Sequence, residues 1–321
     1  MISLLLNHIT MSAVKRYTDY SSRLHMLFPD CRIQKISVNA GFTCPNRDGT
    51  KGLGGCTYCN NKSFAPEYCF SNKPVRQQVV DGMAFFLHKY PQQKYLVYFQ
   101  SYTNTYGNID KLISLYEEAL AVPNVLGIIV GTRPDCMSQA LLDYFATLSK
   151  KKFVLIEYGV ESVYDTTLQH INRGHSFAEA HQAIKQTAAC GLFVGAHIIL
   201  GLPNETRPML LKAAEILSML PIHSLKMHQL QLIKGTVMAE QYSKNSDAFH
   251  FFNLPDYIEL VVDFLERLNP SIAIDRFVSQ SPTDMVIMPR WGLKNFEFAA
   301  KVESCLEERD TFQGKLFQVP L

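Results

Sequence analysis

Two nearly continuous apolar runs, VLGIIVGT at residues 125–132 and FVLIEYGV at residues 153–160, give the clearest indication of the fold. Between them, leucine and phenylalanine recur at the spacing of one helix face over residues 137–149, which predicts an amphipathic helix. Strands that are apolar along their whole length are typical of parallel sheets, because helices cover both faces of such a sheet. The segment therefore predicts a strand, a helix and a second strand parallel to the first.

The same unit recurs along most of the chain. Helix starts are marked by Pro74, by Asn108 as a cap, by Ser176 and Glu179 as a capping box, and by Thr206 before Arg-Pro. Six strands alternating with helices predict a partial (β/α)6 TIM-type barrel in the α/β class, with a doubly wound open sheet as the alternative. The predicted strands cover residues 33–39, 95–100, 125–132, 153–160, 193–200 and 225–233, the Pro74 helix runs to about Tyr90, and the Ser176 helix ends at Gly191.

The rhythm of strand and helix changes after residue 235, which predicts a boundary there. We expect an N-terminal segment over residues 1–32, a barrel over residues 33–235, and a small α/β extension over residues 236–321 that packs on the barrel. The extension is predicted to hold a helix near 255–268, a strand near 272–279 and a last helix near 294–307.

Composition bounds the class of protein. The chain has 321 residues, of which 47% are apolar and 19% charged, so a sizeable buried core is feasible and the composition argues against global disorder. The formal net charge of +2 neither demands nor excludes a polyanionic partner. No apolar run is long enough to span a bilayer, and the opening MISLLLNHIT lacks the features of a signal peptide, so we expect a cytoplasmic protein without membrane contact. In that compartment the eight cysteines stay reduced, and cysteines that share a loop are metal or cluster ligands rather than disulfides.

Three cysteines share one glycine-rich loop, CPNRDGTKGLGGCTYC at residues 44–59. Cys44, Cys56 and Cys59 have the spacing C-x11-C-x2-C. Three thiolates can hold a [4Fe-4S] cluster and leave one iron open to a substrate. With Cys69 as a fourth ligand, the same residues could instead form a closed zinc site. Spacing alone leaves both possibilities open.

The predicted strands end in polar loops at residues 100–106, 131–136, 157–162 and 201–205. In a βα barrel the site forms at the carboxyl ends of the strands, so these loops and the cysteine loop predict one shared site. Glu157 and Glu161 share one face of their strand because side chains alternate.

Several motifs together resemble those of radical S-adenosylmethionine (SAM) enzymes. The run GFTCPNRDG…GGCTYC from Gly41 to Cys59 is similar to the signature of an elongator-like bacterial family of that superfamily, which resembles the radical SAM domain of the elongator catalytic subunit. The long first cysteine gap departs from the familiar C-x3-C-x2-C but matches this branch. The resemblance covers most of the chain through TRPD at 132–135, EYGVES at 157–162, NRGH at 172–175, IILGLP at 198–203 and PRWG at 289–292.

The resemblance implies a set of cofactors and ligands. Cys44, Cys56 and Cys59 would bind a [4Fe-4S] cluster whose fourth iron chelates SAM, and reductive cleavage of SAM would yield a 5′-deoxyadenosyl radical. Arg173 would pair with the SAM carboxylate, and Glu161 would accept from the ribose hydroxyls. Glu157 stands beside these positions, where the two carboxylates could alternatively perform acid–base work.

Other implied roles are less direct. The run QSYTNT replaces the glycine-rich segment usual in the superfamily, so Gln100, Thr103 and Asn104 are candidates to receive the SAM ammonium group. Gly201 would shape the adenine end of the site. Cys136 is a candidate hydrogen-atom donor, with a small apolar filler as the alternative interpretation.

Three functions remain open at this level. The first is a radical SAM enzyme acting on RNA, with a tRNA base as the expected substrate and a flavodoxin- or ferredoxin-type electron donor. The second is a radical SAM enzyme acting on a small metabolite or peptide, and the third is a zinc-binding protein without catalysis. The sequence does not indicate an oligomeric state.

Overall fold

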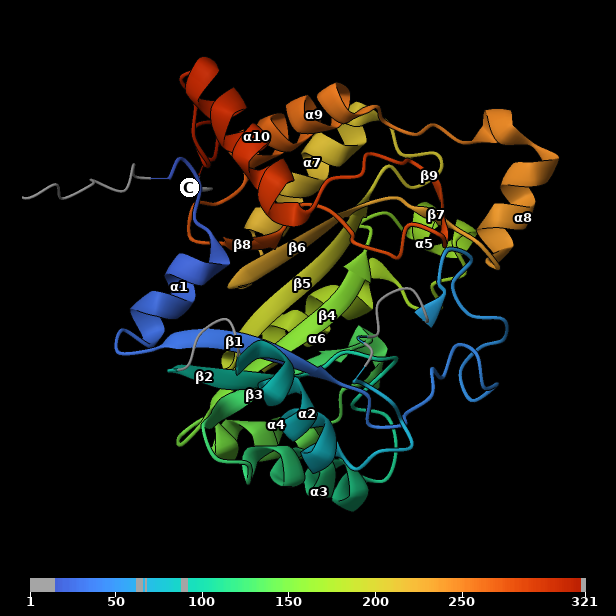
Figure 1. The fold of residues 1–321 in the computed structure, drawn as a ribbon. Helices are drawn as coiled ribbons and strands as arrows, with labels where there is room; N and C mark the ends of the chain where they lie inside the picture. Colours follow the sequence, from blue (N-terminus) through green and yellow to red (C-terminus); the bar gives the residue numbers. More distant parts are fainter. Residues whose placement is uncertain (1–14, 62–65, 67, 88–91, 319–321) are drawn as a thin grey trace, which may run out of the picture.

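The computed structural model describes residues 15–61, 66, 68–87 and 92–318 of the chain (Figure 1). The N-terminal stretch at residues 1–14 and the predicted helix end at Tyr90 lie outside the described residues. The elements are α1 (Tyr20–Leu27), β1 (Arg32–Val38), α2 (Val75–Leu87), β2 (Gln93–Phe99), α3 (Ile109–Leu120), β3 (Val125–Thr132), α4 (Gln139–Leu148), β4 (Phe153–Glu161), α5 (Asp165–His170), α6 (Phe177–Ala189), β5 (Phe193–Leu200), α7 (Arg207–Ser218), β6 (Ser224–Gln229), β7 (Leu232–Ile233), α8 (Val237–Lys244), α9 (Leu254–Arg267), β8 (Ala273–Arg276), β9 (Val286–Met288) and α10 (Asn295–Glu308), with short 3-10 helices at Pro134–Cys136 and Ser246–Ala248.

Seven parallel strands form one curled sheet in the order β1-β2-β3-β4-β5-β6-β8. Each strand up to β6 lies next to the strand that precedes it in sequence, and helices line the outer face of the curl (Figure 1). This arrangement confirms the predicted partial barrel, and the doubly wound alternative, in which strand order reverses, is wrong.

The end of the predicted barrel differs from the expectation in two respects. The run 225–233 does not form one strand: β6 ends at Gln229, and β7 pairs antiparallel with β9 in a separate two-stranded sheet. The strand near 272–279 is β8, which pairs parallel with β6 and so extends the barrel sheet beyond residue 235. The physical reason is burial of apolar side chains: Ile272 and Ile274 pack in the main core and Ala273 packs in the cluster that α1 also joins, which places β8 beside β6.

Helix starts follow their local signals. Asn108 caps α3 by accepting from the Lys111 amide, and Ser176 and Glu179 form the predicted capping box of α6. Such caps satisfy amide groups that have no partner inside the helix.

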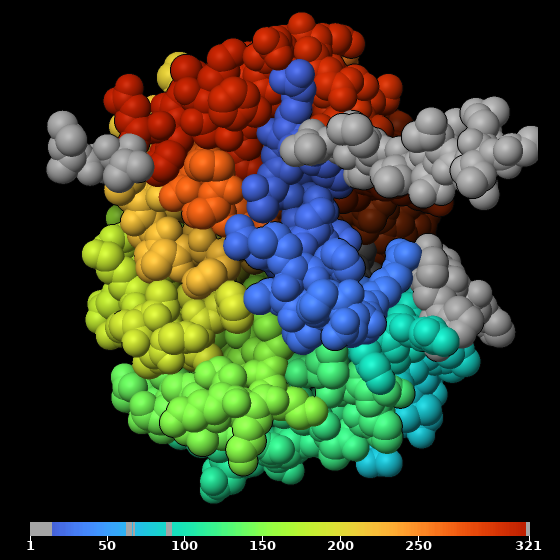
Figure 2. Space-filling model, turned by 90° about the vertical axis from the view of Figure 1, so that its left-hand side faces the viewer, coloured from blue at the N-terminus to red at the C-terminus, as the bar shows by residue number. Residues whose placement is uncertain are grey.

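The barrel stays open between its edge strands, β1 and β8, and α1 occupies this side. Helix α1 contacts both strands, and Figure 2 shows the blue N-terminal region that contains it between the C-terminal elements in orange and red and the elements of the first half of the chain in cyan and green. Tyr20 and Leu24 of α1 pack with Leu96 and Leu155 in an apolar cluster inside the barrel. The helix therefore closes the end of the barrel opposite the carboxyl ends of the strands.

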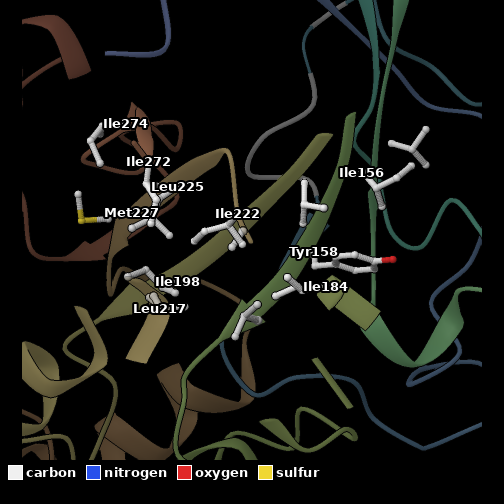
Figure 3. Close-up of a cluster of buried hydrophobic side chains, with 14 of the residues drawn as sticks. Ile156, Tyr158, Ile184, Ile198, Leu217, Ile222, Leu225, Met227, Ile272 and Ile274 are labelled. Carbon is white, nitrogen blue, oxygen red and sulfur yellow. The ribbon is translucent and has the colours of Figure 1, made fainter. Parts of the chain in front are cut away.

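The main apolar core lies between the sheet and its outer helices. Figure 3 shows Ile156 and Tyr158 of β4 beside Ile184 of α6, and Leu225 and Met227 of β6 in the same layer. Alternation along each strand then directs the intervening residues into the barrel interior. Two of those residues are charged: Glu157 lies between Ile156 and Tyr158, and Lys226 lies between Leu225 and Met227.

Candidate functional site

A cavity of about 230 Å³ opens at the carboxyl ends of the strands. Its wall includes all three cysteines of the cysteine loop, together with strand-end residues of β3, β4, β5, β6 and β8. The loop and the strand ends thus meet at one site in the structure. Active sites of βα barrels lie at this end because the loops that follow the strands converge there.

The cysteine loop is held in place by the segment that joins α5 to α6. The Thr57 amide donates to the Ile171 carbonyl at 3.0 Å, and the Asn172 side-chain amide donates to the Gly55 carbonyl at 2.8 Å. Gly55 has a φ of 75°, and a Cβ at this position would lie 2.6 Å from the Arg47 side chain. Only glycine therefore fits this turn, which sits immediately before Cys56.

The thiols of the loop lie close enough to influence one another electrostatically. Burial raises the pKa of Cys59 to about 11, and the neighbouring Cys56 and Cys44 thiols add to this shift. A thiolate cluster in this position is consequently costly without a compensating positive charge, and a bound metal ion supplies such a charge.

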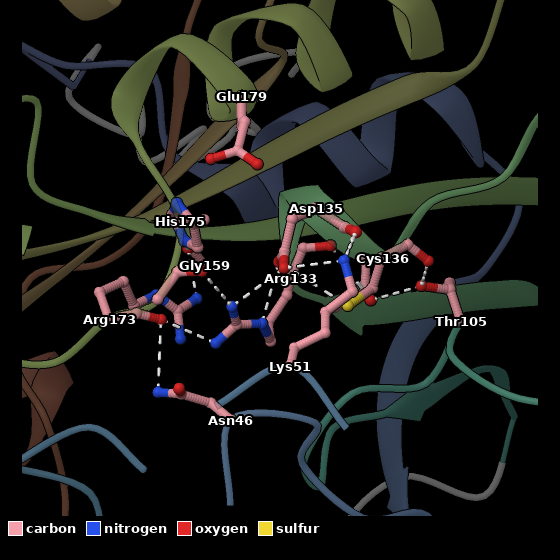
Figure 4. A network of polar contacts seen from close by, with 12 residues as sticks. Asn46, Lys51, Thr105, Arg133, Asp135, Cys136, Gly159, Arg173, His175 and Glu179 are labelled. Atoms are coloured by element: carbon pink, nitrogen blue, oxygen red, sulfur yellow. Dashed lines mark hydrogen bonds and ion pairs between the residues drawn. The ribbon is translucent and has the colours of Figure 1, made fainter. Parts of the chain in front are cut away.

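Arg173 supplies a second cation beside the thiols. Its Nη1 lies 3.6 Å from Cys56 Sγ, and its Nη2 lies 3.4 Å from Glu161 Oε1. Gly159 makes room for this side chain, because a Cβ there would lie 2.5 Å from Arg173 Nη2 (Figure 4 labels both residues). The motifs EYGVES and NRGH, far apart in sequence, therefore come together around one guanidinium group.

Arg133 has a positioning role that the sequence of its motif, TRPD at 132–135, does not reveal. Its Nη1 donates to the Arg173 carbonyl at 2.7 Å, and its Nη2 donates to the Gly174 carbonyl at 3.0 Å. Asp135 anchors the Arg133 guanidinium at 2.9 Å and also pairs with Lys51 of the cysteine loop at 3.1 Å (Figure 4). The only local signal was an arginine followed two residues later by an aspartate.

Glu157 lies at the floor of the cavity in a buried polar network. Its Oε1 is 2.6 Å from His197 Nε2 and 2.8 Å from Lys226 Nζ, and it accepts a hydrogen bond from the Tyr98 hydroxyl. Burial alone would raise the pKa of Glu157, but its interactions with His197 and Lys226 outweigh burial and hold its pKa well below the usual range. Sequence reasoning missed Lys226, whose signal was a lysine within an apolar strand.

Two of the residues suggested for the SAM ammonium line the cavity and one does not. Gln100 accepts from the Ser37 hydroxyl at 2.9 Å at the cavity wall, and Thr103 also lines the cavity. Asn104 is fully buried outside the wall, where its side-chain amide donates to the Phe99 and Gly131 carbonyls at 3.1 and 2.8 Å. Asn104 therefore connects β2 to β3.

Gly201, Cys136 and Cys69 are not part of the cavity wall. Gly201, with a φ of 90°, faces Phe252 in a small separate pocket. Burial raises the pKa of Cys136 to about 12 and that of Cys69 to about 12, so both thiols are protonated at neutral pH. Cys69 does not line the cavity with the other three cysteines, and no group of three or more potential ligands among the described residues is placed to hold a single metal ion, so the four-cysteine zinc site is not assembled.

The cavity has polar atoms suited to a bound polar molecule. Thr103 Oγ1 and Arg173 Nε are buried and have no hydrogen-bond partner among the described residues. Buried polar atoms are almost always paired in folded proteins, so such atoms at a cavity indicate contacts made by a ligand. Together with three cysteines on one wall, this donor set fits an iron–sulfur cluster and an adjoining small molecule.

A half-open parallel barrel with three cysteines at the carboxyl ends of its strands defines a class of cluster-binding α/β proteins. Residues 41–217 match the model of the Radical SAM superfamily, and residues 222–308 match that of the Radical SAM C-terminal domain. The chain belongs to the radical SAM superfamily, whose proteins bind a [4Fe-4S] cluster and SAM and are generally enzymes.

Several known proteins are similar to this chain. The uncharacterized protein YtqA of Bacillus subtilis is 34% identical over 95% of this chain and 94% of its own length. Protein YhcC of Escherichia coli is 33% identical over 86% of this chain and 88% of its own length. Elongator complex protein 3 of Mus musculus is 26% identical over 64% of this chain, which spans 38% of the mouse protein.

A solved structure supports the fold. The archaeal Methanocaldococcus infernus Elp3 superposes with a TM-score of 0.66 over 88% of this chain and 64% of that chain, at 17% identity. In the part of the chain that the structure describes, no helix combines the length and apolar character needed to cross a membrane.

Proposed function

We propose that this chain is a radical SAM enzyme that holds a [4Fe-4S] cluster on Cys44, Cys56 and Cys59 and binds SAM in the adjoining cavity. The observation that carries the proposal is that these three cysteines share one cavity wall with Arg173 and Glu161. When bound, the cluster and SAM supply reductive cleavage of a carbon–sulfur bond, which yields a 5′-deoxyadenosyl radical that takes a hydrogen atom from substrate.

The protein's own residues position the reactants and compensate their charge. The α5–α6 segment fastens the cysteine loop, so the thiols keep a fixed relation to the strand ends. Arg173 offsets negative charge beside Cys56. Glu161 orients its guanidinium group, and Arg133 holds its backbone by donating a hydrogen bond to the Arg173 carbonyl. We assign Thr103 as a donor or acceptor to a polar group of SAM, because its hydroxyl group lines the cavity and has no partner among the described residues.

Apolar side chains complete the cavity wall. Ile199, Leu230 and Ile233 line the cavity together with Tyr58, and such a lining limits the entry of water. A reactive radical requires this shielding, because exclusion of solvent prevents side reactions.

Anaerobic reconstitution with iron and sulfide, followed by SAM and dithionite, tests the proposal. We expect release of 5′-deoxyadenosine by the wild type and at least a hundredfold loss in Cys56→Ala. Cys190→Ala is the matched control, because Cys190 lies at the end of α6 and outside the cavity. A protein that binds no iron, or a Cys56→Ala variant with full activity, would sink the proposal.

We also propose a flavodoxin- or ferredoxin-type electron donor and a tRNA base as substrate. The ground for an RNA substrate is the resemblance of the cysteine-loop signature to that of the elongator catalytic subunit. Elongator complex protein 3 of Mus musculus is similar to 64% of this chain. A mobility shift with tRNA that weakens between about 50 and 200 mM salt would support it, because phosphate contacts release counterions. A lack of binding at the lower salt concentration would direct the search to a small metabolite or peptide.

A further inference from the structure

The wall of the cavity that β6 and β8 contribute has no role in the proposed binding of cluster and SAM. We call this part the β6–β8 wall and define it by His228 of β6, Arg276 of β8, and Ser279 and Ser281 of the loop that follows β8, all of which line the cavity. These residues come from the second half of the chain, whereas the cysteine loop precedes β2. A substrate has to enter the same cavity, so this wall is available to bind it.

A bulge directs two consecutive charged side chains of β8 into the barrel. Ile274 pairs with Leu225 and Arg276 pairs with Lys226, which leaves Asp275 as the extra residue on β8. A bulge of this kind can place neighbouring side chains on one face of a sheet. Asp275 accordingly contacts Lys35 at 2.6 Å inside the barrel, while Arg276 lines the cavity.

The charges below Arg276 are already matched. Lys226 contacts Glu157 at 2.8 Å and Asp275 at 3.4 Å, and Lys35 contacts Asp275 at 2.6 Å. Two ammonium groups therefore face two carboxylates, and the His197 ring also contacts Glu157 at 2.6 Å. Arg276 adds a further positive charge to this interior.

Arg276 itself has no compensating partner in the part of the chain that the structure describes. Its half-buried side chain forms no hydrogen bond or ion pair with any residue that the structure describes. Glu161, the other carboxylate of the cavity wall, is engaged by Arg173 at 3.4 Å. A guanidinium group in a cavity favours an oxyanion, because its planar fork of donors matches carboxylate and phosphate oxygens.

A second donor is available on the same wall. His228 Nδ1 lies 2.6 Å from the Ser279 hydroxyl, and His228 Nε2 is buried without a partner among the described residues. When Ser279 donates to Nδ1, the proton of the neutral ring resides on Nε2, which can then donate to a ligand. The wall thus offers one charged and one neutral donor.

We propose that the β6–β8 wall is a substrate subsite that binds an oxyanion of the substrate, a phosphate or a carboxylate, through Arg276 with His228 as a second donor. This inference rests on the proposed function, because it assigns the rest of the cavity to cluster and SAM. It narrows the substrate to a molecule that carries such an anionic group near the hydrogen atom to be removed.

Calorimetric titration of the reconstituted protein with inorganic phosphate and with acetate tests the subsite, each with and without saturating SAM. The variant is Arg276→Gln. Arg76→Gln is the matched control, since Arg76 is an exposed arginine on α2 away from the cavity. We expect one of the two anions to bind the wild type and the control alike, and to bind Arg276→Gln at least tenfold more weakly.

The two anions distinguish a phosphorylated substrate from a carboxylic acid. The inference would be overturned if each anion bound Arg276→Gln as tightly as it binds the wild type, or if neither anion bound the wild type. Loss of anion binding when SAM is present would also overturn it, since the site would then belong to the SAM carboxylate. Thermal unfolding supplies a second readout: without anion, Arg276→Gln should be at least as stable as the wild type, whereas a structural arginine would lower the melting temperature.

The titration is independent of turnover. A protein that binds phosphate through Arg276 but releases no 5′-deoxyadenosine contradicts the proposed function alone. A protein that cleaves SAM but binds neither anion through Arg276 contradicts the subsite alone.

Discussion

Replacing Glu157 by glutamine removes the carboxylate at the centre of the barrel interior. In the wild type this carboxylate contacts His197 at 2.6 Å and Lys226 at 2.8 Å. The side chains of Glu157 and Lys226 are only 5% and 6% exposed, so water cannot screen the charge that the substitution leaves behind. Lys226 and Lys35 would then share Asp275 as their remaining carboxylate.

The expected cost follows from this geometry. Removing one partner of a buried ion pair destabilises a protein by about 3–5 kcal/mol, because the other charge stays buried without compensation. A typical domain has a total stability of about 5–15 kcal/mol, so the loss is large on that scale. The double variant Glu157→Gln/Lys226→Met removes both charges and should recover most of the loss.

Urea unfolding at pH 7, followed by circular dichroism and by the fluorescence of Trp291, measures these differences. Glu215→Gln is the control, because Glu215 and its partner Lys212 are 47% and 62% exposed and their pair should contribute less than about 0.5 kcal/mol. A loss below about 1 kcal/mol in Glu157→Gln would refute the description of a charged, unscreened interior. A double variant less stable than the single variant would refute the pairing with Lys226.

Three further predictions concern other parts of the site and its scaffold. Burial raises the pKa of Glu205 to about 7, so folding favours its protonated form, and the stability that this form contributes at pH 5 is lost as pH rises through 7. The free energy of unfolding of Glu205→Gln should therefore exceed that of the wild type by about 1–3 kcal/mol at pH 8 and by little at pH 5. Urea unfolding at the two pH values measures this difference. Gly159→Ala places a Cβ 2.5 Å from Arg173 Nη2, and should weaken SAM binding at least tenfold by calorimetry while the circular dichroism spectrum stays native. Ser176→Ala removes the cap of α6 and should cost about 1 kcal/mol in urea unfolding.

Each of these predictions has a contrary outcome. An equal effect of Glu205→Gln at both pH values would show that burial does not govern its carboxyl group. If Gly159→Ala binds SAM with the affinity of the wild type, Arg173 does not contribute to SAM binding. An unchanged unfolding midpoint in Ser176→Ala would mean that the α6 cap is replaced by solvent.

Much of the scaffold can be predicted from short segments of the sequence. The apolar runs of β3 and β5 were predicted with the bounds that the structure has, and the caps at Asn108 and Ser176 act as their side chains indicate. These signals depend on residues within a few positions of one another. The cysteine loop is likewise evident from spacing and glycine content alone.

The composition of the site was decided only by tertiary structure. Arg133, Lys226 and Arg276 gain their roles from partners or cavities formed by strands far away in sequence, and a bulge at Asp275 sets the direction of Arg276. Asn104 and Gly201 follow strands as a wall residue would, yet neither reaches the cavity. The sequence by itself therefore determined the βα rhythm and the cysteine loop, because both arise from short-range spacing. Strand register and bulges determined which polar side chains share the cavity, because side-chain direction depends on pairing between distant segments.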